Sequence, residues 1–201
     1  IGHRGHPEVI GTMGQLPPGA VHLIETVEQA RAFTPRDAGA LAYVTQTTLS
    51  VDDAAEVVAA LKKRFPRIVG PKKGDICYAT QNRQDAVKVL AGKVDVVIVV
   101  GSPNSSNSNR LREVAAHGGV PAYMVDRVEE LDPAWLAGRA RVGVTAGASA
   151  PEILVRQVVG RLRELGAGEV SDLDGGVEKV VFPMPRGLAA GNKAPETGAG
   201  R

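Results

Sequence analysis

Short runs of β-branched residues alternate along the chain with segments whose apolar positions recur at helical spacing. The clearest strand pattern lies at 94–100, where valine and isoleucine fill almost every position, as is typical of a buried parallel strand. The clearest helix pattern lies at 51–64, where apolar residues recur every three or four positions. The same criteria predict further strands at 21–24, 41–44, 122–125 and 142–145, further helices at 27–33, 81–90, 109–116 and 151–165, and short helical pieces around Val128 and Trp135.

This alternation predicts an α/β fold with parallel sheets, because helices serve as the crossovers between parallel strands. The charged, proline-containing stretch 67–74 is a candidate hinge. We therefore expect two similar, small parallel-sheet α/β units at 1–73 and 74–167, followed by a C-terminal segment at 168–201. From about residue 186 this segment is rich in glycine, alanine and proline, and we expect a flexible tail there.

Two capping patterns predict where helices begin. Ser50, followed three residues later by Asp53, marks the start of the helix at 51–64. Ser149, followed by Glu152, marks the start of the last helix, with a proline in its first turn. On this interpretation Ser149 is simply an N-cap residue.

The composition is that of a globular protein and narrows the function classes. Of the 201 residues, 43% are apolar and 23% are charged, and the net charge of +2 is too small to favour a nucleic-acid-binding surface. No apolar run is long enough for a transmembrane helix, so we expect no membrane partner. The one cysteine excludes an internal disulfide and fits a reducing compartment, so we expect a cytoplasmic location.

Hydroxyl and amide side chains follow the predicted strands at three places. Ser105, Ser106 and Asn107 lie just after the strand at 94–100, Thr47 follows the strand at 41–44, and Ser149 follows the strand at 142–145. Open α/β sheets bind ligands at the carboxyl ends of their strands, and the helix N-termini that follow attract anions. Each loop taken alone could equally be a turn, a cap or a strand end, but three in one series predict a shared anion site.

His6 and Glu8 form a second candidate pair. Pro7 disfavours a helix at His6, and in an extended segment the side chains at positions i and i+2 point to the same face. A histidine and a carboxylate aimed together can bind an anion and move a proton. The alternative is a surface pair without a role.

Cys77 is a third candidate, because it follows a possible strand start and precedes a predicted helix. Thiolates near helix N-termini bind metals or act as nucleophiles. The alternative is a buried cysteine that packs like a small apolar residue.

Five polar motifs, in this order, resemble 4-hydroxy-3-methylbut-2-enyl diphosphate reductase, the last enzyme of the non-mevalonate isoprenoid route. The motifs are GHRGHPEV at 2–9, TQTTLS at 45–50, DICYATQNRQ at 75–84, GSPNSSNS at 101–108 and TAGASAP at 145–151. The resemblance covers about residues 1–186 and implies three similar α/β domains around a [4Fe–4S] cluster held by three cysteines.

What the resemblance implies for individual residues is specific. Cys77 would be the third ligand of the cluster, and Glu8 would deliver protons. The substrate would receive electrons from a donor such as ferredoxin or flavodoxin and lose its hydroxyl group as water, which gives isopentenyl and dimethylallyl diphosphates. The residues that would contact the substrate, mostly through its diphosphate, are His6, Thr47, Ser105, Ser106, Asn107 and Ser149.

The chain departs from the family in one large respect. The first domain, with two of the three cluster cysteines and two further substrate histidines, has no counterpart, so we expect the second and third domains only and an inactive fragment. Two other interpretations of the same loops remain open. One is an isomerase or transferase of phosphate esters with an inert Cys77, and the other is a non-catalytic α/β binding module.

Overall fold

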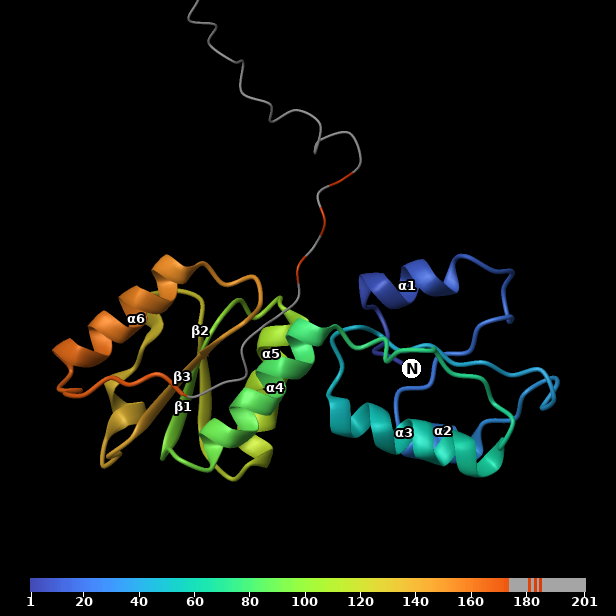
Figure 1. Ribbon diagram of the computed structural model, residues 1–201, viewed down its shortest axis with the longest axis horizontal. Coiled ribbons are helices and arrows are strands. Elements are labelled where there is room, and N and C mark those ends of the chain that lie inside the picture. Colours follow the sequence, from blue (N-terminus) through green and yellow to red (C-terminus); the bar gives the residue numbers. More distant parts are fainter. Residues whose placement is uncertain (174–180, 182, 184, 186–201) are drawn as a thin grey trace, which may run out of the picture.

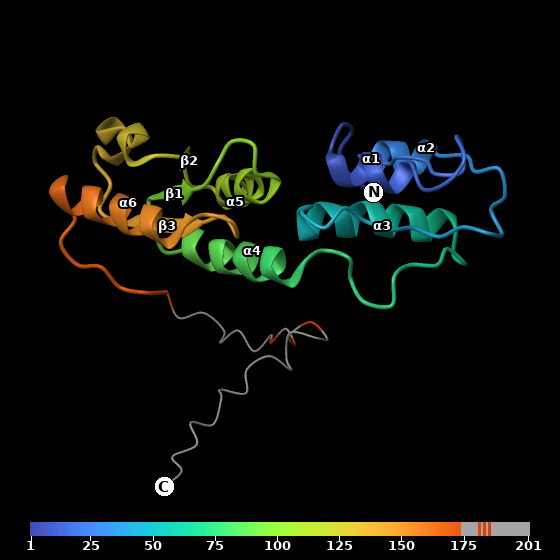
Figure 2. The ribbon, with the colours of Figure 1, turned by 90° about the horizontal axis from the view of Figure 1, so that it is seen from above.

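The computed structural model describes residues 1–173, 181, 183 and 185. The elements form two groups, with α1 to α3 in one and the sheet with α4 to α6 in the other, as Figures 1 and 2 show. The helices are α1 (Pro7–Met13), α2 (Val27–Ala32), α3 (Val51–Arg64), α4 (Tyr78–Ala91), α5 (Ser106–His117) and α6 (Glu152–Glu164). The strands are β1 (Val96–Val100), β2 (Ala122–Val125) and β3 (Val142–Ala146), and two 3₁₀ turns are η1 (Val128–Glu130) and η2 (Pro133–Leu136).

The second group is a three-layer α/β unit. Its three strands are parallel in the order β2-β1-β3, and every residue of the central strand β1 is buried. Alternate residues of β1 face opposite layers, because side chains alternate along a strand. Val96, Ile98 and Val100 belong to the core that includes α6, whereas Val97 and Val99 belong to the core with α4 and α5. The predicted parallel α/β architecture is confirmed in this unit.

The first group has helices and an isolated parallel bridge in place of a continuous sheet, so of the two similar parallel-sheet α/β units that we expect, only the second group has the sheet. The segments at 21–24 and 41–44, predicted as strands, are extended but form only the isolated parallel bridge between Ala42 and Val69. Backbone hydrogen bonds also join Ile1 to Val44 and to Gln46. A strand ladder requires several consecutive pairs, and these short segments pair at single positions. Their core lies instead against α2 and α3.

The predicted helices are confirmed, with shifts at their first turns that matter for the site. The helix at 51–64 has the expected bounds, and the Ser50 hydroxyl accepts a hydrogen bond from the backbone N–H of Asp53. By contrast, α4 and α5 each begin three residues earlier than their apolar spacing indicates. Their first turns consist largely of polar residues that hydrophobic periodicity does not detect. As a result Cys77 and Ser105 lie at the N-cap positions.

The tail expected from residue 186 onward lies outside the described residues. In the part of the chain that the structure describes, none of the helices combines the length and the apolar character needed to cross a bilayer.

Candidate functional site

His6 and Glu8 are neighbours, but not in the way that an extended segment would place them. The helix α1 begins at Pro7, so Glu8 lies in its first turn, and His6 is the N-cap residue with an extended backbone. The His6 Nδ1 atom accepts a hydrogen bond from the backbone N–H of Glu8 at 3.3 Å. The expectation of an extended His6–Glu8 segment was wrong, because proline restrains the residue before it but is itself favoured as the first residue of a helix.

The Glu8 carboxylate is held by Thr47 from the loop before α3. The backbone N–H of Thr47 donates to both carboxylate oxygens, at 3.0 and 3.2 Å, and the Thr47 hydroxyl lies 3.0 Å from Oε2. Hydrogen bonds to an ionised carboxylate are stronger than those between neutral groups. Glu8 is therefore anchored in a half-buried position by a residue 39 positions away in the sequence.

Thr47 also contacts the candidate thiol residue. Its carbonyl accepts a hydrogen bond from the backbone N–H of Cys77 at 3.0 Å. Cys77 is exposed at the N-cap of α4, so the interpretation of a buried cysteine that packs like a small apolar residue does not hold. We call His6, Glu8, Thr47 and Cys77 the Thr47 cluster.

A second set of candidates lies at the start of α5. The Ser105 hydroxyl accepts a hydrogen bond from the backbone N–H of Ser108, so Ser105 caps the helix, and Ser106 begins it. Asn107 is 7% exposed, and among the described residues neither polar atom of its side chain has a hydrogen-bond partner. Buried amides are normally hydrogen-bonded. The amide of Asn107 therefore has hydrogen-bonding capacity that no described residue uses.

Ser149 does not cap α6, which is a correction to the sequence prediction. The helix begins at Glu152, its N-cap residue is Pro151, and no side chain caps it. A cap at Ser149 would require a helical conformation at Ala150, which the following proline disfavours. Ser149 instead lies exposed in the loop after β3.

The loop after β3 packs beside the start of α5. A Cβ atom placed on Gly147 would lie 3.8 Å from Asn107 Nδ2 and 2.2 Å from Ser108 Oγ. The backbone N–H of Gly147 also donates to the Val100 carbonyl at the end of β1. We call Ser105, Ser106, Asn107 and the loop that carries Ser149 the Asn107 cluster.

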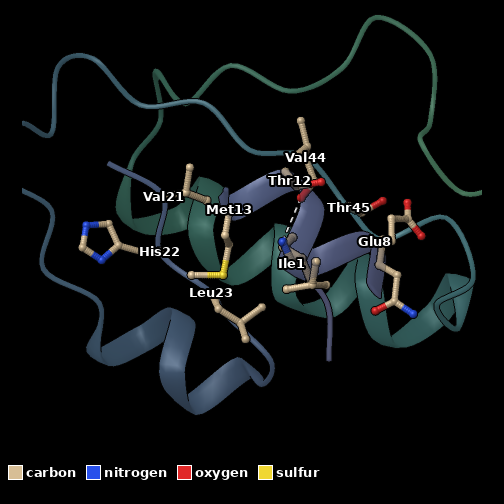
Figure 3. Close-up of a pocket in the computed structure, with 11 residues that line it drawn as sticks. Ile1, Glu8, Thr12, Met13, Val21, His22, Leu23, Val44 and Thr45 are labelled. Carbon is tan, nitrogen blue, oxygen red and sulfur yellow. Dashed lines mark hydrogen bonds between the residues drawn. The ribbon is translucent and has the colours of Figure 1, made fainter. Parts of the chain in front are cut away.

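The pocket in Figure 3 lies beside the Thr47 cluster but does not unite the candidates. It is formed by α1 and the segments at 21–23 and 44–46, and Glu8 is the candidate residue that lines it. In the figure Glu8 lies on the side of Thr45, away from His22. Ser105, Asn107 and Ser149 belong to the Asn107 cluster on the second unit.

The starts of α4 and α5 are electrostatically suited to an anion. The first turns of α4 and α5 contain no acidic residue, so the positive ends of these helices are not neutralised there. Free backbone N–H groups at such helix ends bind phosphates and carboxylates. Hydroxyl and amide side chains in the same places add neutral donors.

The described residues do not supply a complete metal site. The structure shows among them no group of three histidine, cysteine or acidic side chains that could hold a metal ion. Cys77 is the one cysteine of the chain, whereas iron–sulfur clusters are held by several cysteines. An exposed thiol at a helix N-terminus fits one ligand of such a group, but this chain alone does not fit the whole group.

Two residues of α4 to which no local sequence pattern assigns a role connect the segments that carry the two clusters. Arg83 donates a hydrogen bond to the carbonyl of Ala146, and Gln84 is fully buried and bonded to Leu49 and Val51. Gln84 lies on the face of α4 that is buried along Thr80, Val87 and Ala91. A large amide at a core position of a helix was the signal that could have identified it.

Together the fold and the clusters define an α/β protein with an exposed thiol and a carboxylate joined through Thr47 and, at the start of α5, a buried amide without a hydrogen-bond partner among the described residues. A family model described as LytB protein matches residues 1–163. The chain therefore belongs to the LytB protein family.

Curated relatives support this assignment along nearly the whole chain. The chain is 65% identical over 189 residues to a protein of Bordetella pertussis named 4-hydroxy-3-methylbut-2-enyl diphosphate reductase, covering 94% of this chain and 58% of that protein. A protein of the same name from Aromatoleum aromaticum is 66% identical over 188 residues, with 94% and 60% covered. The chain thus spans about 58–60% of the length of these relatives.

A solved structure has the same fold over much of this chain. The E-1-hydroxy-2-methyl-but-2-enyl-4-diphosphate reductase from Plasmodium falciparum matches with a TM-score of 0.75 and 39% sequence identity. The match covers 80% of this chain and 50% of that structure.

Proposed function

We propose that this chain forms the diphosphate-binding and proton-delivering part of a 4-hydroxy-3-methylbut-2-enyl diphosphate reductase. The observation that carries the proposal is the 65% identity, over 94% of the chain, to a protein of that name. The overall reaction replaces the C–OH bond of the substrate with C–H. It consumes two electrons and two protons, and it releases water with isopentenyl or dimethylallyl diphosphate.

The chain's own residues would hold the substrate and supply a proton. The diphosphate would be bound by donors from both clusters, with the unpaired amide of Asn107 and the helix end at Ser105 contributing most directly. The Glu8 carboxyl, held by Thr47, would give a proton to the reacting carbon or the leaving oxygen. The proposed binding residues are His6, Thr47, Ser105, Ser106, Asn107 and Ser149.

A [4Fe–4S] cluster would supply electron transfer and a Lewis-acidic iron, with Cys77 as one of its three cysteine ligands. The other two ligands would have to come from sequence beyond this chain, because the chain has one cysteine. A ferredoxin or flavodoxin is the proposed electron donor, and the proposed location is the cytoplasm.

We further propose that the chain is divided into units at 1–73 and 74–167 and a C-terminal segment at 168–201. Limited proteolysis tests this division, because a boundary between the first two units should be cut first within 67–74.

The ligand assignment is tested by Cys77→Ser in the complete protein that contains this chain, purified without oxygen. We expect the unchanged protein to be brown and to contain iron and sulfide, and the variant to lose most of both. Unchanged iron, sulfide and turnover in the variant would show that Cys77 is not a ligand. A colourless, iron-free unchanged protein would favour the isomerase, transferase or binding-module interpretations.

The proton-transfer role is tested by Glu8→Gln in the same protein, which keeps the shape of the side chain. We expect kcat to fall about 100-fold or more, since general acids typically contribute that much. Glu28→Gln is the matched control, because Glu28 is also an acidic residue in the first turn of a short helix. Near-normal turnover of the Glu8 variant would refute the role.

A further inference from the structure

Gln84 joins α4 to the loop that carries Thr47. Its side chain is completely buried, and both of its polar atoms are hydrogen-bonded. Oε1 accepts from the backbone N–H of Val51 at 3.0 Å, and Nε2 donates to the Leu49 carbonyl at 2.8 Å. A buried amide with both atoms satisfied by backbone groups fixes the relative position of the two segments.

The bond to Val51 has a specific local reason. Val51 is the first residue of α3, and the first N–H groups of a helix have no acceptor within the helix. Ser50 satisfies the N–H of Asp53, and Gln84 satisfies that of Val51. The start of α3 thus depends on a side chain from another helix.

These bonds belong to a row of hydrogen bonds between the segments 45–51 and 75–84, which we call the seam. At its start Asp75 Oδ2 accepts from the backbone N–H of Thr45 at 2.8 Å. In its middle the N–H of Cys77 donates to the Thr47 carbonyl at 3.0 Å. Gln84 closes the seam at the other end. Thr47, which holds the Glu8 carboxylate, therefore lies between two fixed points.

Arg83 makes the corresponding connection to the second unit. Its Nε donates to the carbonyl of Ala146 at 3.3 Å, and its Nη1 donates to the Ala79 carbonyl in the first turn of α4. Ala146 is the last residue of β3, directly before the loop that carries Ser149. Adjacent side chains of α4 thus hold one loop from each cluster.

We propose that Arg83 and Gln84 are positioning residues that set the Thr47 and Ser149 loops on either side of the helix that begins at Cys77. This inference rests on the proposed function, because the loops that Arg83 and Gln84 hold matter for binding only if their residues bind the diphosphate. Neither side chain needs to touch the substrate. Their effect would pass through the loops that they hold.

The role of Gln84 is tested first by amide hydrogen exchange in the complete protein that contains this chain. We expect Gln84→Met to increase the exchange rate of the Val51 amide about tenfold, because that N–H loses its acceptor. The Asp53 amide is the internal control, since its acceptor is Ser50. An unchanged Val51 exchange rate would overturn the proposed contact.

A second variant separates positioning from general damage to the fold. In Gln84→Glu, a protonated carboxyl can donate to Leu49 and accept from Val51, whereas an ionised carboxylate only accepts. We expect the Val51 amide to keep an acceptor in both protonation states. We expect the affinity for inorganic pyrophosphate to approach that of the unchanged protein at low pH and to fall as pH rises, because the ionised carboxylate faces the Leu49 carbonyl with no proton between them. The unchanged protein at the same pH values is the control. Equal affinity at all pH values would contradict the role.

The Arg83 side is tested by pyrophosphate binding with Arg83→Met and Arg83→Lys. We expect about tenfold weaker binding for methionine and partial recovery for lysine, which keeps a cation and a donor. Arg156→Met is the control, because Arg156 pairs with Glu152 on the surface of α6. Unchanged binding by Arg83→Met would refute its role.

The outcomes distinguish this inference from the proposed function. If the unchanged complete protein that contains this chain does not bind pyrophosphate, the proposed anion site is wrong, and Val51 exchange still decides whether Gln84 orders the loop. If Gln84→Met loses Val51 protection but binds pyrophosphate normally, Gln84 has only a structural role and the inference is overturned.

Discussion

The close approach of Ser108 to two glycines gives a sharp test of how the end of β1 and the end of β3 are held together. An ideal Cβ on Gly101 would lie 2.2 Å from Ser108 Oγ and 2.7 Å from Ser108 Cβ. A Cβ on Gly147 would also lie 2.2 Å from the hydroxyl, but 3.4 Å from Ser108 Cβ. The first clash therefore involves an atom fixed to the backbone of α5, and the second involves only a hydroxyl that can rotate.

The two alanine substitutions should differ in magnitude for this reason. Gly101→Ala overpacks a buried site and should lower the free energy of unfolding by about 1–3 kcal/mol. Gly147→Ala should lower the free energy of unfolding by about 0.5–1.5 kcal/mol, because the Ser108 hydroxyl must leave its preferred rotamer. This loss is partly offset by about 0.4–1 kcal/mol, because alanine restricts the unfolded chain more than glycine does. Neither glycine has a positive φ, so backbone strain adds nothing.

A change at Ser108 should rescue one substitution and not the other. Ser108→Ala removes Oγ, which among the described residues has no hydrogen-bond partner. In that background Gly147→Ala should become stabilising by about 0.4–1 kcal/mol. Gly101→Ala should remain destabilising, because the 2.7 Å contact with Ser108 Cβ persists.

Urea unfolding followed by circular dichroism measures these differences, provided that the m-value stays constant. Gly160→Ala is the control, since Gly160 lies within α6 and an added Cβ would meet nothing within 4 Å. It should stabilise the protein by about 0.5–1 kcal/mol. Equal rescue of both glycine variants by Ser108→Ala, or a stable Gly101→Ala protein, would refute the reasoning.

Three further predictions concern stability. Ile98→Ala should cost about 2–5 kcal/mol in the free energy of unfolding, because Ile98 is fully buried in β1; a loss below 1 kcal/mol in urea unfolding would contradict this core assignment. Ser50→Ala should cost about 1 kcal/mol in the same assay, since it removes the cap on the Asp53 amide, and an unchanged midpoint would show that the cap contributes nothing. The backbone N–H of Arg141 lowers the pKa of Asp95 from its ordinary 3.8. The contribution of Asp95 to stability is therefore complete above pH 3.8 and is lost as pH falls through the lower folded-state pKa, so Asp95→Asn should flatten acid unfolding curves in that range.

Much of the second unit could be predicted from local patterns. The β-branched run at 94–100 predicted the buried central strand, and its length and composition leave few alternatives. In the first unit, the short apolar segments at 21–24 and 41–44 predicted strands that the structure does not contain. A strand forms only where it can pair with another segment, so a four-residue apolar pattern by itself does not reliably predict a strand.

The candidate site, too, was predictable from the sequence only in part. The sequence by itself placed polar residues after the predicted strands and before the predicted helices, so it offered Cys77, Ser105 and Asn107 as candidates from their places along the chain. Only the tertiary structure decided that Glu8 is held by Thr47 and that Gln84 closes the seam beside Cys77. The contacts from Glu8 and Gln84 join residues 39 and 33 positions apart, and no local periodicity encodes such pairs. They form because folding buries polar groups that must find hydrogen-bond partners.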